Sequence, residues 1–261
     1  MRSSGLAFGV CCRLQWRDRA GFHRLPCFAV RLFYALNSGT RQGKADAPFP
    51  PTPGFGAALQ EMNRVDIRLL LISHASTAAQ RAGRFPADDP LDARAIAEAR
   101  THATNTRLAI AESASAYVSP AVCARETAAA LGLAASVDVA LADMNYGHWR
   151  GRRLADLEAE APQDLAAWIR DPDASPHGGE SFSQLVKRVG EWLVALGGTP
   201  DLASADMCNV VAVTHAPLLR AAIVYALGAS TAVFSRIEIA PLSMIELRHS
   251  SRGWTWWPAT H

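Results

Sequence analysis

From residue 68 onward, short apolar runs alternate with longer segments of helical periodicity. The strand-length runs lie at residues 69–72, 116–118, 137–140, 209–214, 237–240, 244–247 and 254–257. Helical segments are expected at residues 92–110, 120–131, 180–196 and 217–227. Strands that alternate with helices are typical of βαβ units. The pattern therefore predicts an α/β domain with a largely parallel sheet.

Residues that favour helix ends support this division. Asp92 is placed to cap the helix over 92–110, and Gly132 and Gly228 follow the ends of two others. The segment 180–196 is amphipathic, with apolar residues near helical spacing. Its expected inward positions are Phe182, Leu185, Val189, Trp192 and Val194.

The first 61 residues differ from the rest. They hold eight Lys and Arg but three acidic residues, and they end near a Pro- and Gly-rich stretch at 47–56. Such a segment favours disorder because it buries too little apolar surface to offset its ordering entropy. A transit peptide is one interpretation. An over-extended start, with Met62 as the true first residue, is the favoured one. Residues 62–261 are then the folded domain.

Composition excludes few functions. The chain is 49% hydrophobic and 19% charged, with a formal net charge of +2, so neither nucleic acid nor a membrane is an expected partner. The five cysteines form no C-x-x-C pair, which favours reduced thiols and a cytoplasmic location. There is no H-E-x-x-H motif and no Cys/His ligand spacing, so no metal or other cofactor is expected. A monomer or homodimer is expected.

Two histidines occupy equivalent positions. His74 follows the apolar run 69–72, and His215 follows the run 209–214. Ligands of open α/β sheets bind at the carboxyl ends of the strands, so both side chains are placed to reach one crevice. A neutral imidazole is a competent nucleophile towards phosphorus. The alternative is that each is a hydrogen-bonded structural histidine at a strand end.

Five segments in order along the chain carry a family resemblance. They are I-S-H-A-S-T (72–77) with R-A-G-R (81–84), S-P-A-V-C-A-R-E-T-A (119–128), L-A-D-M-N-Y-G-H-W-R-G (141–151), P-H-G-G-E-S (176–181) and V-A-V-T-H-A (211–216). Together they resemble the histidine phosphatase superfamily, in its phosphoglycerate mutase-like and α-ribazole phosphatase-like branch. The resemblance implies a three-layer α/β/α sandwich with a mostly parallel central sheet.

The resemblance also implies a function. It is hydrolysis of a small phosphorylated metabolite through a phosphohistidine intermediate. His74 corresponds to the nucleophile and His215 to the second pocket histidine. Asp143 stands where the family usually has the glutamate that acts as general acid, and an exposed loop aspartate is the alternative.

The expected phosphate pocket departs from the family pattern. Ser73 and Cys123 replace two arginines, and neither residue supplies their charge. Arg81 and Arg84 are expected to compensate from the segment that follows the nucleophile. Thr77 is expected to contact phosphate or to cap a helix, and Glu180 to bind substrate or to cap its helix. Cys123 also fits a buried small apolar position.

The remaining candidates are weaker. Arg125 is expected on a solvated helix face. Arg150 and Arg220 lie in other segments expected near the pocket. His148 and His177 are expected to be surface loop histidines rather than substrate contacts. Because two pocket arginines are missing, a second function stays open. It is a catalytically inactive pseudophosphatase that binds a ligand or partner.

Overall fold

The computed structural model describes residues 65–109, 114–198 and 207–257. The expected leader over 1–61 and its boundary with the folded domain lie outside these residues. In the described part of the chain, no helix is both long and apolar enough to span a membrane.

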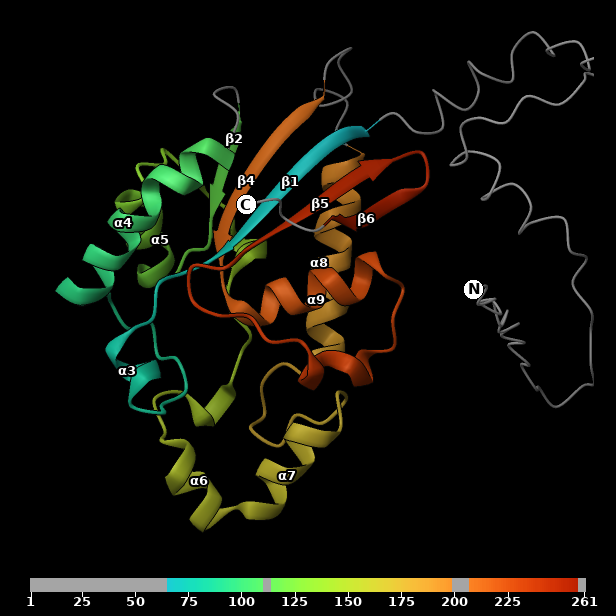
Figure 1. The fold of residues 1–261 in the computed structure, drawn as a ribbon. Coiled ribbons are helices and arrows are strands. Elements are labelled where there is room, and N and C mark those ends of the chain that lie inside the picture. The colour runs from blue at the N-terminus through green and yellow to red at the C-terminus, as the bar shows by residue number, and fades with distance from the viewer. Residues whose placement is uncertain (1–64, 110–113, 199–206, 258–261) are drawn as a thin grey trace, which may run out of the picture. The chain divides into compact units, whose positions relative to one another are not determined.

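A six-stranded sheet forms the centre of the domain (Figure 1). Its strands are β1 (Val65–Ser73), β2 (Ser115–Val118), β3 (Ser136–Val137), β4 (Cys208–Thr214), β5 (Met244–Ser250) and β6 (Gly253–Trp257), in the order β3-β2-β4-β1-β5-β6. The four strands β3, β2, β4 and β1 pair in parallel, and β5 and β6 add antiparallel. The sheet is therefore mixed and mostly parallel.

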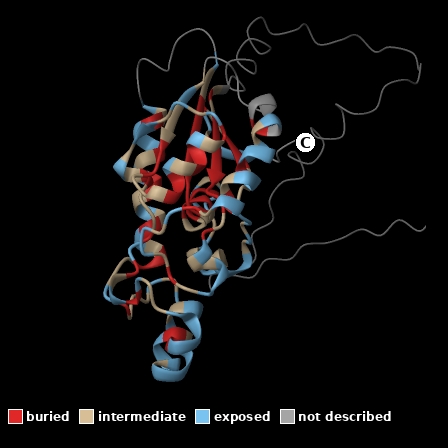
Figure 2. Cartoon of the chain, turned by 90° about the vertical axis from the view of Figure 1, so that its left-hand side faces the viewer, coloured by how far each residue is buried: buried red, intermediate tan, exposed pale blue. Residues whose placement is uncertain are grey.

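Helices cover both faces of the sheet. Alternate residues of a strand point to opposite faces. Leu70 and Ile72 of β1 accordingly pack in a cluster with α5 (Val122–Ala130), against which α4 (Ala93–Ala109) lies. Leu69 and Leu71 pack in the other cluster with α8 (Phe182–Gly197) and α9 (Ala216–Ala226). Burial follows these three layers, with buried residues in the sheet and exposed residues on the outer helix faces (Figure 2).

The register of β1 and β4 positions the two histidines. Ser73 pairs with Thr214, so both strands end at the same level of the sheet. The backbone N–H of His74 donates to the carbonyl of Thr214 over 2.8 Å. Beyond this edge lie three further helices: α3 (Ala78–Arg81), α6 (Leu154–Glu160) and α7 (Pro162–Arg170) (Figure 1).

The structure corrects two expected strands. Of residues 137–140, only Val137 lies in a strand; Val139–Leu141 forms a 3-10 helix that Asp138 caps through the N–H of Ala140. Val139 is 77% exposed, so its apolar character did not indicate burial. Residues 237–240 form no strand and follow a further 3-10 helix at Thr231–Arg236.

The helix predictions also need adjustment. Asp92 accepts a hydrogen bond from the N–H of Ala95, as expected of the cap of α4. The next helix begins at Val122 rather than at 120. In α8 the expected inward residue Val194 is 61% exposed, because it falls on the outer face. Helices α6 and α7 were not expected, and most of their residues are exposed.

A buried carboxylate joins the two central antiparallel strands. Glu246 of β5 accepts hydrogen bonds from Arg68 of β1 at 2.8 Å and from Arg248 at 2.6 Å. Burial alone would raise its pKa, but the hydrogen bonds from Arg68 and Arg248 outweigh burial and hold the pKa below its usual value. The ionised form therefore stabilises the fold above the unfolded-state pKa, and this contribution is lost as the pH falls through the folded-state pKa.

We expect Glu246→Gln to lower the free energy of unfolding by about 1–3 kcal/mol at pH 7, because two charge-assisted hydrogen bonds lose their charge. The deficit is expected to shrink at acid pH, below the lowered folded-state pKa of Glu246, because the native carboxyl is itself protonated there. Urea denaturation at pH 7 and at acid pH measures it. Glu238→Gln is the control, because Glu238 is 91% exposed and lies 4.0 Å from Arg220. An equal Glu246→Gln deficit at both pH values would contradict the ionic contribution.

Candidate active site

His74 and His215 meet where β1 and β4 end. Their ring centroids lie 4.9 Å apart in an edge-to-face arrangement, and both side chains are buried. The Nδ1 atom of His74 lies 2.7 Å from the carbonyl oxygen of Ala75. A carbonyl only accepts, so Nδ1 carries the proton and Nε2 of the neutral ring has a free lone pair. The nearest polar contact of Nε2 is the amide of Gln80, at 3.5 Å.

His215 is held from its far side. Its Nε2 atom lies 2.8 Å from Oγ of Ser119, and this hydroxyl oxygen accepts the backbone N–H of Ala121. Its Nδ1 atom faces the site, 3.4 Å from Oδ2 of Asp143, and is buried with no hydrogen-bond partner among the described residues. The structure thus presents Nε2 of one histidine and Nδ1 of the other to the same space.

Burial sets the protonation of both rings. Burial, together with the nearby His215, lowers the pKa of His74 to about 4. It lowers the pKa of His215 to about 3, with the charge of Arg188 acting in the same direction. Both imidazoles are therefore neutral at pH 7. A neutral His74 suits a nucleophile, whereas a neutral His215 contributes no positive charge to an anion.

Asp143 supplies the carboxylate. It follows the 3-10 helix Val139–Leu141, and its Oδ1 accepts the N–H of Met144 over 2.8 Å. Arg188 of α8 anchors this loop by donating to the carbonyls of residues 140, 142 and 143. Burial raises the pKa of Asp143 to about 6. The alternative of an exposed loop aspartate is wrong, since the side chain is 16% exposed and faces His215.

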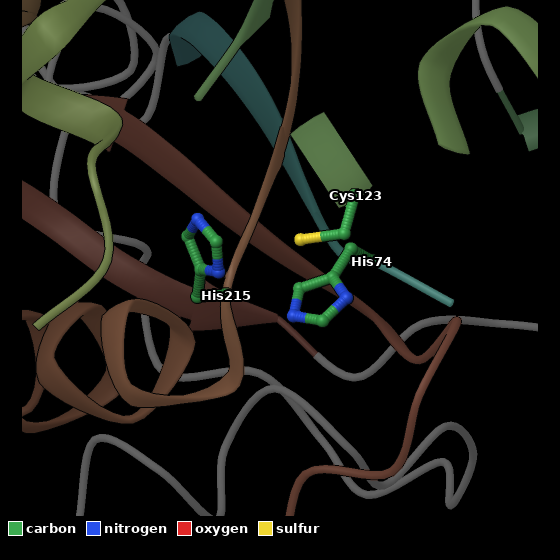
Figure 3. Close-up of side chains that lie close together, drawn as sticks. All are labelled: His74, Cys123 and His215. Atoms are coloured by element: carbon green, nitrogen blue, oxygen red, sulfur yellow. The ribbon is translucent and has the colours of Figure 1, made fainter. Parts of the chain in front are cut away.

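Cys123 approaches the histidines from the other side. It lies in the first turn of α5, is buried, and directs its sulfur toward the two imidazoles (Figure 3). Burial raises the pKa of its thiol to about 12, and the charge of Asp143 raises it as well. The side chain is therefore a neutral thiol that lines the site, where the family pattern has an arginine.

These side chains line one cleft of about 410 Å³. The lining residues are His74, Thr77, Gln80, Pro86, Asp88, Asp89, Ser119, Pro120, Ala121, Cys123, Ala142, Asp143, Met144, Asn145, Tyr146, Arg150 and His215. Three of them are aspartates and one is an arginine. The carboxylate of Asp88 also lies against the first residue of α5, where its Oδ1 accepts the N–H of Val122 over 2.9 Å. The cleft is therefore poor in donors for a phosphate dianion.

The expected compensating arginines do not enter this cleft. Arg81 pairs with Asp92 and donates to the carbonyl of Ser76. Arg84 donates to the carbonyl of Gly151 over 3.0 Å, Arg125 is exposed on α5, and Arg220 is directed to Glu238. Arg150 is the arginine that lines the cleft.

The other predicted binding residues divide between the cleft and its surroundings. Thr77 lines the cleft and caps α3, exchanging hydrogen bonds with Gln80. Ser73 is buried and lines a separate hollow of about 280 Å³ beside His74. Glu180 forms a bidentate ion pair with Arg188 at 2.8 and 2.9 Å and does not line the cleft. The helix-capping alternative for Glu180 is wrong, because Ser181 caps α8.

The G-G-E-S segment supports the Asp143 loop by close packing. A Cβ on Gly179 would lie 2.0 Å from the carbonyl oxygen of Asn145, so a glycine is required there. The N–H of Glu180 donates to the same carbonyl over 2.8 Å. His177 is fully buried beside Trp149, which corrects its expected surface position, whereas His148 is exposed.

Sequence reasoning missed Ser119 and Gln80 as contacts of the two histidines. Ser119 opens the second quoted motif, and its position directly after β2 is the signal that could have identified it, since β2 is the parallel neighbour of β4. Gln80 carried no comparable signal. Its side chain lies beside His74 because the short helix α3 holds it there.

Comparisons with known proteins agree with this geometry. A family model described as the histidine phosphatase superfamily (branch 1) matches residues 69–257. The bifunctional protein Rv2228c of Mycobacterium tuberculosis is 27% identical over 228 residues, which is 81% of this chain and 60% of that protein. The chain thus spans about 60% of the length of such relatives.

Two further similarities are a shorter sequence match and a solved structure. The glucosyl-3-phosphoglycerate phosphatase of Mycobacterium tuberculosis is 34% identical over 93 residues, covering 34% of this chain and 42% of that protein. The solved structure of mycobacterial hydrolase 1 superposes with a TM-score of 0.65 at 26% identity, over 74% of this chain and 99% of that one.

Proposed function

This chain belongs to the histidine phosphatase superfamily, branch 1, and from that premise we propose that it hydrolyses small phosphomonoesters through a phosphohistidine formed on His74. The observation that carries the proposal is the orientation of His74. Its Nδ1–H is committed to the carbonyl of Ala75, which directs the lone pair of Nε2 into the cleft.

The proposed reaction has two displacement steps. Nε2 of His74 attacks phosphorus and forms the N–P bond while the P–O bond to the ester oxygen breaks. Asp143 donates its proton to that oxygen, and the alcohol leaves. A water molecule then attacks phosphorus, the N–P bond breaks, and Asp143 accepts the proton of the water. Phosphate leaves, and both side chains return to their starting states.

Burial supports these roles. With a pKa of about 4, His74 is neutral and nucleophilic at pH 7. With a pKa of about 6, Asp143 lies nearer to neutral pH than an ordinary aspartate, which favours proton donation. Its Oδ2 lies 3.4 Å from His215 Nδ1, so the carboxyl and both imidazoles border the same space.

A second candidate function is binding without turnover. The specific observation in its favour is the charge of the cleft, with one arginine against three aspartates among its lining residues. Loss of one preorganised donor costs on the order of 10²–10³ in rate, and the family pattern has lost two here. The two candidates differ in whether His74 ever carries a phosphoryl group.

Trapping the phosphoenzyme tests the proposal. The full chain is mixed with radiolabelled p-nitrophenyl phosphate in the presence of a metal chelator, quenched in alkali and separated from free label. We expect label that survives alkali and is released by acid, because the N–P bond of phosphohistidine has that stability. His74→Asn is expected to carry none.

His148→Asn is the matched control, since His148 is exposed and does not line the cleft. It is expected to label like the native protein. Acid-stable label, or label that persists in His74→Asn, would exclude a phosphohistidine on His74. A native protein that takes up no label would favour binding without turnover.

A further inference from the structure

The unprotonated Nε2 of His74, Nδ1 of His215 and the sulfur of Cys123 converge between β1, β4 and α5. Nε2 of His74 is unprotonated because Nδ1 donates to the carbonyl of Ala75. Nδ1 of His215 is buried without a hydrogen-bond partner among the described residues. The sulfur of Cys123 points to the same space (Figure 3). Ligand atoms of the three residues all lie within 4.8 Å of one another.

A carboxylate completes the group. Oδ2 of Asp143 lies 3.4 Å from Nδ1 of His215, while Oδ1 is taken by the N–H of Met144. When Ser119 accepts the Nε2 proton of His215, Nδ1 and the ionised carboxylate oxygen are two acceptors that face each other. A cation between them satisfies both, whereas a phosphate dianion adds a further set of acceptors.

We propose that His74 Nε2, Cys123 Sγ, His215 Nδ1 and Asp143 Oδ2 form a zinc-binding site at the position where the family binds phosphate. Two imidazoles, a thiolate and a carboxylate are the donor types that Zn²⁺ takes in tetrahedral sites. Hard cations such as Mg²⁺ and Ca²⁺ instead prefer six or more oxygen ligands.

The charge of the site fits a divalent cation. Binding deprotonates the thiol of Cys123, so the thiolate and the Asp143 carboxylate together balance the two positive charges of Zn²⁺. The buried site is then neutral overall. The other charged groups that line the cleft are Asp88, Asp89 and Arg150, which leaves its remaining lining slightly negative.

The surroundings of each imidazole resemble those of established zinc ligands. A ligating histidine usually donates its other ring N–H to a carbonyl, hydroxyl or carboxylate oxygen, which fixes the ring. The carbonyl of Ala75 has this role for His74, and Oγ of Ser119 takes it for His215 in the tautomer that leaves Nδ1 unprotonated. Tetrahedral zinc bonds of about 2.0–2.3 Å place ligand atoms about 3.5 Å apart, so the three atoms need to contract by on the order of 1 Å.

Occupancy by zinc has a consequence for His74. The same Nε2 atom is the metal ligand and the proposed nucleophile, so a zinc-loaded site cannot form phosphohistidine. Zinc is therefore an inhibitory ligand of this protein. The binding itself does not depend on the proposed phosphatase function, and it is measured without any phosphate ester.

Cobalt substitution tests the site directly. The full-length, chelator-treated protein is titrated anaerobically with Co²⁺ and followed by absorbance. We expect one equivalent to give the intense visible bands of tetrahedral cobalt and a near-ultraviolet thiolate-to-cobalt charge-transfer band. One equivalent of Zn²⁺ is expected to abolish both. Cys123→Ser is expected to lose the charge-transfer band and to bind more than about 100-fold more weakly.

Matched variants exclude the other cysteines. Cys208→Ala and the triple variant Cys11→Ser/Cys12→Ser/Cys27→Ser are expected to keep the native spectrum. If Cys123→Ser fails to fold, Cys123→Ala provides the same readout. A native protein without the charge-transfer band, or a band that persists in both Cys123 variants, overturns the zinc site. Phosphoenzyme labelling that is unchanged by saturating Zn²⁺ would overturn the inhibitory role.

Discussion

Placing arginine at both position 73 and position 123 is expected to raise the hydrolysis of p-nitrophenyl phosphate by at least about 100-fold. Cys123 lines the cleft beside both imidazoles, and Ser73 lines the hollow beside His74. An arginine at 123 would add a charge-assisted, bidentate phosphate donor to a cleft whose lining has one arginine and three aspartates, and an arginine at 73 would place a second donor beside His74 from the neighbouring hollow. The gain is measured as kcat/KM by absorbance.

Controls separate charge from other effects of these substitutions. All assays contain a chelator, because the arginine at 123 also removes the proposed zinc ligand. Cys123→Ala removes the thiol without adding charge and is not expected to reproduce the gain. Met207→Arg adds an arginine at an exposed residue outside the cleft and tests for a general charge effect. An arginine double variant that folds but gains less than tenfold would refute charge loss as the cause of a weak native activity.

The second large effect is expected at Asp143. Asp143→Asn should lower kcat for an alkyl phosphate such as glycerol 3-phosphate by about 10²–10⁴, because the amide cannot protonate the leaving alkoxide. p-Nitrophenolate leaves without protonation, so the loss for p-nitrophenyl phosphate should be much smaller. Comparing kcat for the two esters therefore distinguishes proton donation from misfolding.

The matched variant is Asp143→Glu. It restores the carboxylic acid that the family has at this position and is expected to keep the activity toward the alkyl phosphate. Equal losses with both esters in Asp143→Asn would identify Asp143 as a structural residue. The contact between its Oδ2 and Nδ1 of His215, at 3.4 Å, is the alternative role that such a result would favour.

The central strands were predictable because their continuously apolar sequence is stable only in the interior of the domain. Residues 69–72 and 210–213 are continuously apolar, and such runs are stable where both faces of a strand are covered. The histidines that follow each run were therefore expected at one edge of the sheet, and the register of β1 against β4 confirms it. The edge strands were less predictable. Val139 is apolar yet 77% exposed, because pairing with β2 ends before it.

The side-chain partners of the charged residues were not predictable from spacing. Arg81 was expected near phosphate, but Asp92 is its partner. Glu180 was expected to bind substrate or cap a helix, but Arg188, two turns along α8, takes both of its oxygens. Choosing between the possible partners of Arg81 or of Glu180 requires knowing where the long side chain points. That direction depends on neighbours from other parts of the chain, which only the fold brings close.

By itself, the sequence determined the alternation of strands and helices, the family motifs in their order, and the loss of two arginines from the expected pocket. Tertiary structure decided what replaces that charge. Nε2 of His74, Nδ1 of His215, Sγ of Cys123 and Oδ2 of Asp143 come from four segments, and no local spacing relates them. Their convergence follows from the strand register, the packing of α5 and the loop that Arg188 anchors, so only the folded chain brings the four proposed metal ligands together.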